Sequence, residues 1–391
     1  MKFFRGCKYA CLPTIVIWAI IFVIGWLISS CSPSPFRSLV PAGTVHLFNS
    51  SGAFISEHTT IQSCVGVAQS GYTCEAGAGD YRSNWSSFYR WTKSNVTLRC
   101  QSFNCRIRPI IFEGNGNTIQ GFEISSDNFK NGIRTYGNYN LILQNEIHSV
   151  LEDAIWLWGT GNIVRGNYFH DIWALGCNAP CTEPFDNHID GIMTDNTFSP
   201  SPIVKTAQDL VIDGNIIVMD RDHGSNAFFM LNAGGNQTVL PKNITWKNNI
   251  FICKDAGFCP IAIFGDSTTT GMKIFNNKFY NTTNRGESAV WMQNAAAECE
   301  INGNQVYGYD TLERPGNFCA KTGNTVLPFA GLPVIVWPPS VGQTLTPTPT
   351  PSSTPIPSTL TPSITPTRTI TPTPTFECLL FPVHAQRVCL P

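Results

Sequence analysis

Two short stretches decide the fold: Leu141-Ile142-Leu143-Gln144-Asn145-Glu146-Ile147 and Ile163-Val164-Arg165-Gly166-Asn167-Tyr168-Phe169. In each, a mostly apolar triplet is followed by Gln or Gly, then by Asn, and then by an apolar residue two positions later. Apolar and polar residues alternate over these runs with the period of β-strands rather than that of helices. The two stretches therefore predict pairs of short strands with an Asn at the turn between them.

The Asn phrase recurs along the middle of the chain. Its asparagines are Asn117, Asn145, Asn167, Asn215, Asn249, Asn277 and Asn304. The successive spacings are 28, 22, 48, 34, 28 and 27 residues, and all but the 48 fit one coil per repeat with loops of variable length. A second phrase lies between them, at Asn131-Gly132-Ile133, Asp153-Ala154-Ile155, Asp190-Gly191-Ile192, Asn226-Ala227-Phe228 and Ser288-Ala289-Val290. We therefore expect an all-β chain that forms a single-stranded parallel β-helix.

These repeats resemble the right-handed parallel β-helix repeat of the pectin-lyase-like superfamily. Upstream, Thr60-Ile61-Gln62 and Gly79-Asp80-Tyr81 resemble the opening of that family, where a short amphipathic helix caps the first coil and a Gly-x-Tyr turn follows. Tyr72-Thr73 stands where the family often has Asp-Thr. The resemblance implies a right-handed β-helix domain over residues 45–330 with a short N-terminal capping helix. It implies the fold more strongly than an activity, because one fold hosts many functions.

Residues 1–31 read as a signal peptide or membrane anchor. Lys2, Arg5 and Lys8 precede an apolar run, as in a signal segment. The run is followed by Ser29-Ser30-Cys31, which resembles the lipobox of bacterial lipoproteins and implies lipidation at Cys31. An ordinary cleaved signal and an uncleaved anchor are the alternatives. All three predict an extracytoplasmic protein, either secreted or anchored to the membrane at the cell surface.

The C-terminal part is unlike the repeats. Residues 341–375 form a Thr/Pro-rich segment, and 9 Pro and 12 Thr account for 21 of the 31 residues from Leu345 to Thr375. Such a segment cannot bury apolar area, so we expect a disordered, extended linker. Residues 376–391 form a short tail that contains two cysteines.

Composition excludes two broad classes of protein. The formal net charge is −1 and only 13% of the residues are charged, which argues against nucleic acid as a partner. The 32 Gly and 27 Pro argue against a helical bundle. Twelve of the 15 cysteines are close neighbours, which favours disulfides formed in an oxidising compartment. The expected pairs are Cys64/Cys74, Cys100/Cys105, Cys177/Cys181, Cys253/Cys259, Cys299/Cys319 and Cys378/Cys389.

Stacking of the coils predicts two polar columns. Equivalent positions of successive coils lie about 4.8 Å apart, so Asp153 and Asp190 of the second phrase become neighbours. Two such carboxylates raise one pKa or bind a cation, for which calcium is the candidate; the alternative is that both residues cap turns. His148 and His170 form the second column, three residues after the corner Asn. The alternative interpretation is that His148 and His170 are simply a stacked pair on the surface.

The step of 48 marks an insertion between Asp171 and His188. It carries Trp173, Cys177 and Cys181 and ends in His188-Ile189-Asp190, which places His188 and Asp190 on the same side of a strand. Cys177 and Cys181 with His170 or His188 could hold zinc, but the other local cysteine pairs favour a disulfide. Arg221 and His223 follow the next corner, and an ordinary solvated turn is the alternative there.

These residues suggest a protein that acts on an extracellular polysaccharide, as a lyase or a glycoside hydrolase. The candidate catalytic residues are Asp153, Asp190, His188, His170, Arg165 and Arg221. The candidate substrate-binding residues are Trp156, Trp158, Trp173, Lys205 and His223. Calcium at Asp153 and Asp190 is the one cofactor that we expect. The alternative function is a non-catalytic glycan-binding or adhesin-like surface protein.

Overall fold

The structure is a computed structural model that describes residues 39–84, 88–125, 131–150, 153–172, 189–195, 207–219, 225–232, 241–254, 261–265, 269–282, 288–292, 298–314, 319–335, 337–338, 377–380 and 387–390. The chain divides into two units, residues 1–339 and 340–391. In the second unit, β34 (Glu377–Leu380) pairs antiparallel with β35 (Arg387–Leu390), with Cys378 opposite Cys389.

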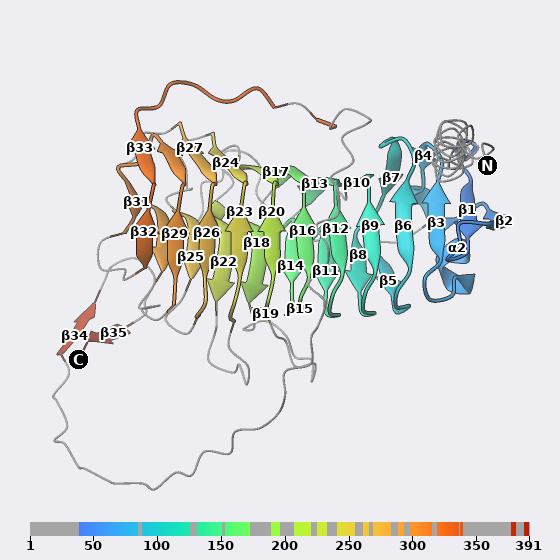
Figure 1. Cartoon of the computed structure of the whole chain (residues 1–391), viewed down its shortest axis with the longest axis horizontal. Helices are drawn as coiled ribbons and strands as arrows, with labels where there is room; N and C mark the ends of the chain where they lie inside the picture. Colours follow the sequence, from blue (N-terminus) through green and yellow to red (C-terminus); the bar gives the residue numbers. More distant parts are fainter. Residues whose placement is uncertain are drawn as a thin grey trace, which may run out of the picture. The chain divides into compact units, whose positions relative to one another are not determined.

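The first unit is a right-handed parallel β-helix built from three long sheets (Figure 1). Sheet A contains, in order, β2 (Phe54–His58), β1 (Val45–Phe48), β3 (Thr73–Ala76), β6 (Thr97–Cys100), β9 (Thr118–Gln120), β12 (Leu141–Leu143), β16 (Ile163–Arg165), β20 (Val211–Asp213), β23 (Thr245–Lys247), β26 (Lys273–Phe275), β29 (Glu300–Asn302) and β32 (Ala320–Thr322). Sheet B contains β4 (Gly79–Asp80), β7 (Cys105–Ile107), β10 (Phe122–Ser125), β13 (Glu146–Val150), β17 (Tyr168–Ile172), β21 (Ile216–Met219), β24 (Ile250–Cys253), β27 (Lys278–Asn281), β30 (Gln305–Tyr307) and β33 (Thr325–Leu327). Sheet C contains β5 (Tyr89–Trp91), β8 (Ile110–Phe112), β11 (Ile133–Thr135), β14 (Ile155–Leu157), β18 (Ile189–Asp195), β22 (Ser225–Asn232), β25 (Ile261–Gly265), β28 (Ser288–Met292) and β31 (Thr311–Glu313).

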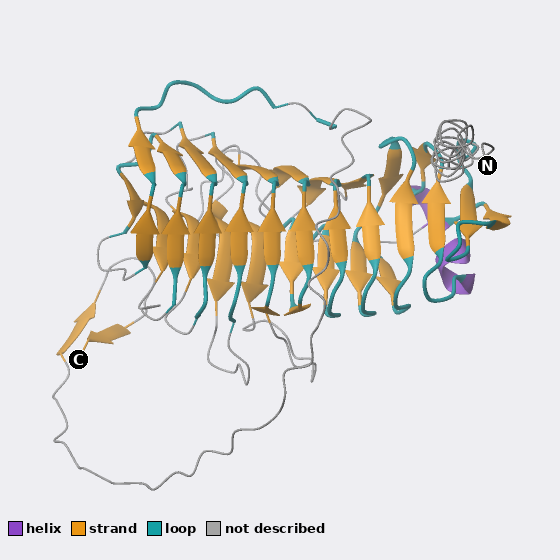
Figure 2. Ribbon diagram, viewed as in Figure 1, coloured by secondary structure: helices purple, strands orange, loops and turns teal. Residues whose placement is uncertain are grey.

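Each coil passes through sheets A, B and C in turn, so strands far apart in sequence lie side by side (Figure 2). Pairing within the three sheets is parallel except around β1, which is antiparallel to both β2 and β3. β15 (Gly159–Thr160) and β19 (Ala207–Gln208) form a small additional parallel pair. The fold predicted from the repeats is therefore confirmed.

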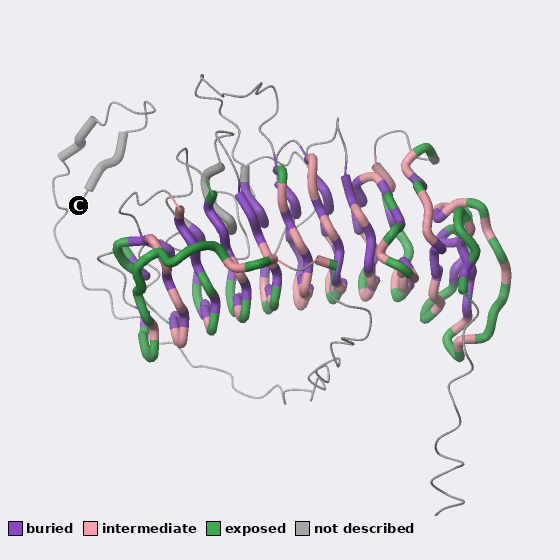
Figure 3. The backbone as a smooth tube through the Cα atoms, turned by 90° about the horizontal axis from the view of Figure 1, so that it is seen from above, coloured by how far each residue is buried: buried purple, intermediate pink, exposed green. Residues whose placement is uncertain are grey.

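The core is a column of apolar side chains inside the coils. Figure 3 shows that buried residues recur from coil to coil along the β-helix. The middle residue of each short strand of sheet A points inward, so Ile142 stacks between Ile119 and Val164. In sheet B the rings of Phe251 and Phe279 stack with their centroids 4.9 Å apart. Because every coil buries its apolar residues against the next one, stability arises between neighbouring coils.

A ladder of buried asparagines closes the corner between sheets A and B. The backbone N–H of Asn167 donates to Asn215 Oδ1 at 2.9 Å, and Asn215 has the same relationship to Asn249. The side-chain Nδ2 of Asn215 donates to the carbonyl of Val164 at 2.9 Å. Each amide thus satisfies backbone groups that the turn would leave unpaired inside the protein.

One residue of the predicted ladder belongs elsewhere. Asn117 precedes β9 of sheet A, and its backbone N–H donates to Asn140 Oδ1. It therefore starts a second ladder at the corner that leads into sheet A, with Asn140 and Asn162 as the next rungs. The 28 residues from Asn117 to Asn145 therefore do not measure the length of one coil, because the two residues lie at different corners. The same short phrase is used at both corners because both turns need a buried amide.

The N-terminal cap agrees with the resemblance. Helix α2 (Ile61–Val67) begins after Thr60, whose side chain accepts the N–H of Ser63 at 3.1 Å as an N-cap. Gly79 and Asp80, for which the resemblance implies a turn, instead form the short strand β4, because they pair in parallel with β7. Tyr81 follows, its hydroxyl donating to the Gly77 carbonyl at 2.8 Å, and the short 3-10 helix η1 (Arg82–Asn84) comes next. Among the described residues, no helix has both the length and the apolar character of a membrane span.

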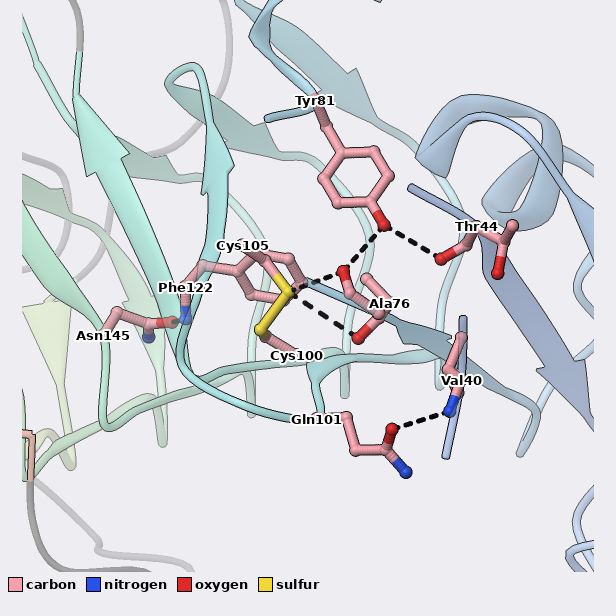
Figure 4. The surroundings of a disulfide bond; sticks show 10 residues. Val40, Thr44, Ala76, Tyr81, Cys100, Gln101, Cys105, Phe122 and Asn145 are labelled. Atoms are coloured by element: carbon pink, nitrogen blue, oxygen red, sulfur yellow. Dashed lines mark hydrogen bonds between the residues drawn. A yellow bond between two sulfur atoms is a disulfide. The ribbon is translucent and has the colours of Figure 1, made fainter. Parts of the chain in front are cut away.

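Three predicted disulfides are present. They join Cys64 to Cys74, Cys100 to Cys105 (Figure 4) and Cys299 to Cys319. Cys253 is also disulfide-bonded, while Cys259, Cys177 and Cys181 lie outside the described residues. The three bonds fit an oxidising, extracytoplasmic compartment.

After β33 the chain turns back along the outside of sheet B (Figures 1 and 3). We call residues 328–335 and 337–338 the strap. Phe329 lies beside Gly308, next to β30, whereas Trp337 contacts Tyr168 of β17. The strap therefore runs from the last coils toward the middle of the β-helix.

Candidate functional site

The connections between the strands indicate which sheet carries the variable part of the molecule. From β12 onward, the connection from sheet A to sheet B is always two residues long; β12, for example, ends at Leu143 and β13 begins at Glu146. Connections on either side of sheet C differ greatly in length: β17 ends at Ile172 and β18 begins at Ile189, whereas β13 ends at Val150 and β14 begins at Ile155. Sites commonly form where variable loops project from a rigid scaffold. The outer face of sheet C is therefore the first place to examine.

A single file of side-chain positions runs along this outer face. Strand pairing aligns Ile111 with Arg134, Arg134 with Trp156, and Trp156 with Met193. Alternation along each strand turns Arg134 and Trp156 outward, because the residues on either side of them are buried. Ile111 and Met193 occupy the equivalent strand positions but are each only 3% exposed. Backbone pairing defines a line of equivalent strand positions, which we call the sheet C file: Arg90, Ile111, Arg134, Trp156, Met193, Met230, Phe264, Trp291 and Arg314.

Arg134 and Trp156 form the best-defined contact in the file. The Arg134 guanidinium lies over the Trp156 ring, 4.5 Å from its centroid, in a cation–π arrangement. Its Nε donates to Asn131 Oδ1 at 2.6 Å. The Trp156 indole N–H donates to the carboxylate of Asp153. Both side chains are half-buried and held by a turn residue beneath them, so the cation and the ring are fixed before any ligand arrives.

Further aromatic rings support this contact. Trp158 packs edge-on against Trp156, with centroids 4.9 Å apart, and stacks with Tyr136 at 5.1 Å. Trp158 is only 2% exposed, so it supports the neighbouring rings and has no open face for a sugar. Tyr136 and Trp156 remain half-buried. Of the two tryptophans expected to bind substrate on this strand, Trp156 is therefore the better placed.

The file carries a second pair of the same kind. The Arg314 guanidinium lies 3.8 Å from the centroid of the Trp291 ring. Trp156 and Trp291 are separated by four steps of the sheet, from β14 through β18, β22 and β25 to β28. Since neighbouring strands lie about 4.8 Å apart, the two rings are about 19 Å apart along the file. A cation–π contact between an arginine and a tryptophan therefore occurs at two places along the sheet C file.

Asp153 and Asp190 are neighbours in successive coils, as predicted, but they lie in the interior. Asp153 is 1% exposed and Asp190 is fully buried. Asp153 Oδ1 accepts the backbone N–H of Asp190 at 2.8 Å, and Oδ2 accepts Asn131 Nδ2 at 3.2 Å. These contacts favour the turn-capping interpretation of Asp153. A catalytic role for either carboxylate stays a prediction.

His148 and His170 stack as predicted, with ring centroids 4.9 Å apart, on the outer face of sheet B. His170 Nε2 lies 3.0 Å from Glu146 Oε1 and its Nδ1 lies 2.7 Å from Asp171 Oδ2. Burial lowers the pKa of His170, but the hydrogen bonds to Glu146 and Asp171 outweigh it, so that the pKa is raised. The hydrogen bond from His170, in turn, lowers the pKa of Glu146.

The remaining predicted residues do not join these groups. Arg165 lies on the outer face of sheet A, where its Nε donates to Asp213 Oδ2 at 3.0 Å. Arg165, His170 and Trp156 thus occupy three different sheets. Several predicted residues lie outside the described residues, namely Cys31, Trp173, Cys177, Cys181, His188, Lys205, Arg221 and His223.

Metal binding is not supported by any cluster in the described part of the chain. No group of three or more His, Cys, Asp or Glu side chains there is arranged to hold a metal ion. Calcium at Asp153 and Asp190 stays a prediction, as does the alternative zinc site at Cys177 and Cys181.

Sequence reasoning missed Arg134, Tyr136, Trp291 and Arg314. A usable signal was present, because Arg134 and Trp156 both follow the second phrase directly, after Ile133 and Ile155. Extending the alignment of that phrase by one residue places Arg134 beside Trp156. The pairing of Arg314 with Trp291 had no such signal, since Arg314 lies outside any copy of the phrase.

No protein-family model matches the chain, and no curated protein matches it. Among solved structures, it is similar to an alginate lyase from Paenibacillus sp. str. FPU-7, with 16% identity and a TM-score of 0.48 over 72% of this chain and 94% of that one. It is also similar to the pectate lyase Pel9A, with 12% identity and a TM-score of 0.44 over 72% and 75% of the two chains. For the Streptococcus pneumoniae surface protein and adhesin PfbA, the identity is 12% and the TM-score 0.41, over 64% of each chain. Likeness at this level describes a fold and not an activity.

Proposed function

We propose that the protein acts on an extracellular acidic polysaccharide that lies along the sheet C file. The observation that carries this proposal is the cation–π contact of Arg134 with Trp156 on an outer face bordered by the variable connections. Arg134 and Trp156 lie on adjacent strands, so they offer a bound polymer a partly exposed cation beside a partly exposed ring. The three disulfides support an oxidising compartment outside the cytoplasm, where extracellular polysaccharides occur.

The chemistry of the two side chains suits a sugar acid. A guanidinium binds a carboxylate through charge-assisted hydrogen bonds, and it keeps its charge at any pH that the protein encounters. An indole ring packs on the apolar face of a pyranose. Asn131 and Asp153 hold the two groups in place from below, which reduces the conformational entropy lost on binding.

The reaction that we propose is cleavage of the polymer by a lyase or glycoside hydrolase mechanism. In a lyase, Arg134 neutralises the uronate carboxylate and so acidifies the C5 proton. A base removes that proton, the C4–O4 bond breaks as the C4–C5 double bond forms, and the leaving oxygen takes a proton from an acid or from water. The candidate base is His188, an assignment that rests on the sequence alone because this residue lies outside the described residues. A hydrolase would instead require two carboxylates.

One observation favours a non-catalytic glycan-binding protein as the second candidate. The carboxylates of Asp153 and Asp190 are buried in the turn rather than open to the outer face. Binding alone requires only Arg134, Trp156 and Tyr136, all of which are partly exposed there. The two functions share one surface and differ in whether a bond is broken.

A binding and cleavage assay tests both candidates. The full chain is mixed with alginate, polygalacturonate and neutral dextran; affinity is measured by calorimetry, unsaturated product by ultraviolet absorbance and hydrolysis by reducing ends. We expect binding to at least one acidic polymer, and we expect Arg134→Gln to weaken it about tenfold, as loss of one charge-assisted contact does.

Lys273→Gln is the matched control, because it removes one positive charge from an exposed position on sheet A. It should leave the affinity unchanged. Binding to dextran alone, or equal loss in both variants, contradicts the sheet C file as an acidic-polymer site. Binding without product supports the second candidate over the first.

A further inference from the structure

The last coil of the β-helix consists of β31, β32 and β33, each of which is the final strand of its sheet (Figure 1). In the described ranges, no further strand pairs with the outer edges of these three strands. β32 and β33 are exposed along their whole length. The strap leads away from this edge, because it runs from β33 toward β17. An exposed strand edge can pair with another chain, so the last coil is a potential interface.

Three inward-facing columns of side chains, one from each sheet, end at this coil. Strand pairing places Glu313 after the column of sheet C, Lys321 after that of sheet A and Val326 after that of sheet B. The preceding residues of the three columns are apolar and fully buried, namely Val290, Ile301 and Val306. Two of the three columns therefore change from apolar to charged residues at the last coil.

Glu313 and Lys321 form an ion pair at the end of the core. The Lys321 ammonium contacts the Glu313 carboxylate, and the Glu313 side chain is 2% exposed whereas that of Lys321 is 48% exposed. No other hydrogen-bond donor meets this carboxylate in the described part of the chain. A buried carboxylate without a partner is strongly destabilising, so Lys321 compensates the charge of Glu313. The exposed cation thus lies where an added coil would begin.

A second copy of this chain is the partner that fits this edge. Two copies that meet last coil to last coil are related by a two-fold axis, so the strand edges of one copy face the same set of edges in the other. The contact would extend all three sheets and bury the side chain of Val326, which is 49% exposed. The opposite end of the β-helix differs, because helix α2 packs there against β1, β2 and β3.

The ion pair opposes such a contact. Lys321 would have to leave water as the two ends meet, and removing a charge from water costs free energy. If the two-fold axis passes through sheet A, the ammonium groups of the two copies also approach and repel each other. We propose that the last coil is a self-association surface for a second copy of this chain, held closed by the Glu313–Lys321 ion pair. This property is independent of the function proposed for sheet C.

Replacing the ion pair by the residues of the preceding coil tests the proposal. Glu313→Val with Lys321→Ile continues both apolar columns, and apolar replacement of a buried ion pair is often neutral or stabilising. Sedimentation equilibrium of the full chain compares the average mass of the variant and the wild type in one buffer. We expect the mass of the variant to rise with concentration to about twice that of the wild type. An unchanged mass in a variant that keeps the wild-type circular dichroism spectrum overturns the proposal.

Glu313→Gln with Lys321→Gln is a second variant, which removes both charges with little change in volume. It should also associate, although less strongly because its amides remain polar, and it tests the proposal if the apolar variant does not fold. In either variant, a mass that keeps increasing beyond a pair of chains would indicate unspecific aggregation and would contradict a two-fold contact.

Three further substitutions locate the contact. Thr322→Val with Thr325→Val adds apolar side chains at exposed, outward-facing positions of β32 and β33 while the ion pair remains, and it should keep the wild-type mass. In the Val/Ile variant, Val326→Lys returns a charge to the third column and should restore the wild-type mass. Ser70→Lys adds the same charge at an exposed position before β3, at the other end, and should leave the association intact. Association of the threonine variant, or equal effects of the two lysines, shows that the proposal is wrong.

Discussion

The carboxylate of Asp153 accepts the indole N–H of Trp156, three residues later in the chain. A buried turn residue thereby orients a half-buried ring on the outer face of sheet C. The same carboxylate accepts the backbone N–H of Asp190 in the next coil. Asp153 therefore contributes both to the stability of the turn and to the position of the Trp156 ring on the surface. A single substitution of Asp153 should affect both properties.

Asp153→Ala should lower the free energy of unfolding by about 3 kcal/mol, because three donors lose their acceptor in the interior. Urea unfolding followed by circular dichroism measures this. Asp153→Asn keeps one acceptor oxygen, so it should lower the free energy of unfolding by less than Asp153→Ala does. Equal stability of the Ala variant and the wild type would show that the turn does not depend on this carboxylate.

Asn249→Ala should cost about 2–4 kcal/mol of the free energy of unfolding, because the side chain accepts from Asn215 and donates to the Ile212 carbonyl and to Asn277. The adjacent Asn248 has φ 58°, a conformation that glycine adopts easily. Asn248→Gly is therefore the control, with a change of less than about 1 kcal/mol. Chemical unfolding of both variants measures the difference, and comparable losses would argue against the ladder as the source of stability.

Replacing Cys299 and Cys319 by Ala should lower the free energy of unfolding by about 2–4 kcal/mol, because the bond closes a loop over a sequence separation of 20. It joins the residues that precede β29 and β32, so the loss should first appear as faster hydrogen exchange in β32. A uniform increase of exchange over all coils would indicate that the bond stabilises the whole β-helix instead.

The Glu146–His170 pair should give the protein a pH optimum of stability. The lowered pKa of Glu146 contributes stability that is present above its unfolded pKa, about 4.3, and is lost as the pH falls through the folded value. The raised pKa of His170 contributes stability that is fully present below its unfolded pKa, about 6.5, and is lost as the pH rises through the folded value. Both contributions are therefore complete between about pH 4.3 and 6.5.

Urea unfolding of the wild type and of Glu146→Gln over pH 3–9 checks this. The difference in unfolding free energy between the two proteins should be greatest inside that window and should shrink on both sides. A difference that keeps growing above pH 7 would show that the two side chains are not linked in the folded protein.

The sequence was sufficient for the repeating part of the structure. Asn145 and Asn167 are separated by one coil and occupy one corner, so their spacing reports the geometry directly. Thr60 and the local cysteine pairs carry equally local signals. Each of these predictions depends on contacts between residues close in sequence or one repeat apart.

The candidate site was harder to predict because its residues come from different faces of one coil. Arg165 and His170 are five positions apart, yet the corner between them sends Arg165 to sheet A and His170 to sheet B. The number of residues between two positions does not show on which sheet each side chain lies. The burial of Asp153 could not be predicted, because a repeated phrase does not show how far its side chain is exposed.

The constant two-residue connection between sheets A and B has an evolutionary consequence. Because each of its asparagines bonds to the rungs above and below in the same way, a whole coil can be duplicated or deleted there with little change to the geometry of the others. Each added coil would lengthen the sheet C file by about 4.8 Å. Under the proposed function, gain or loss of single repeats in the gene would change the length of polymer that a descendant accommodates, while the loops beside sheet C diversify separately.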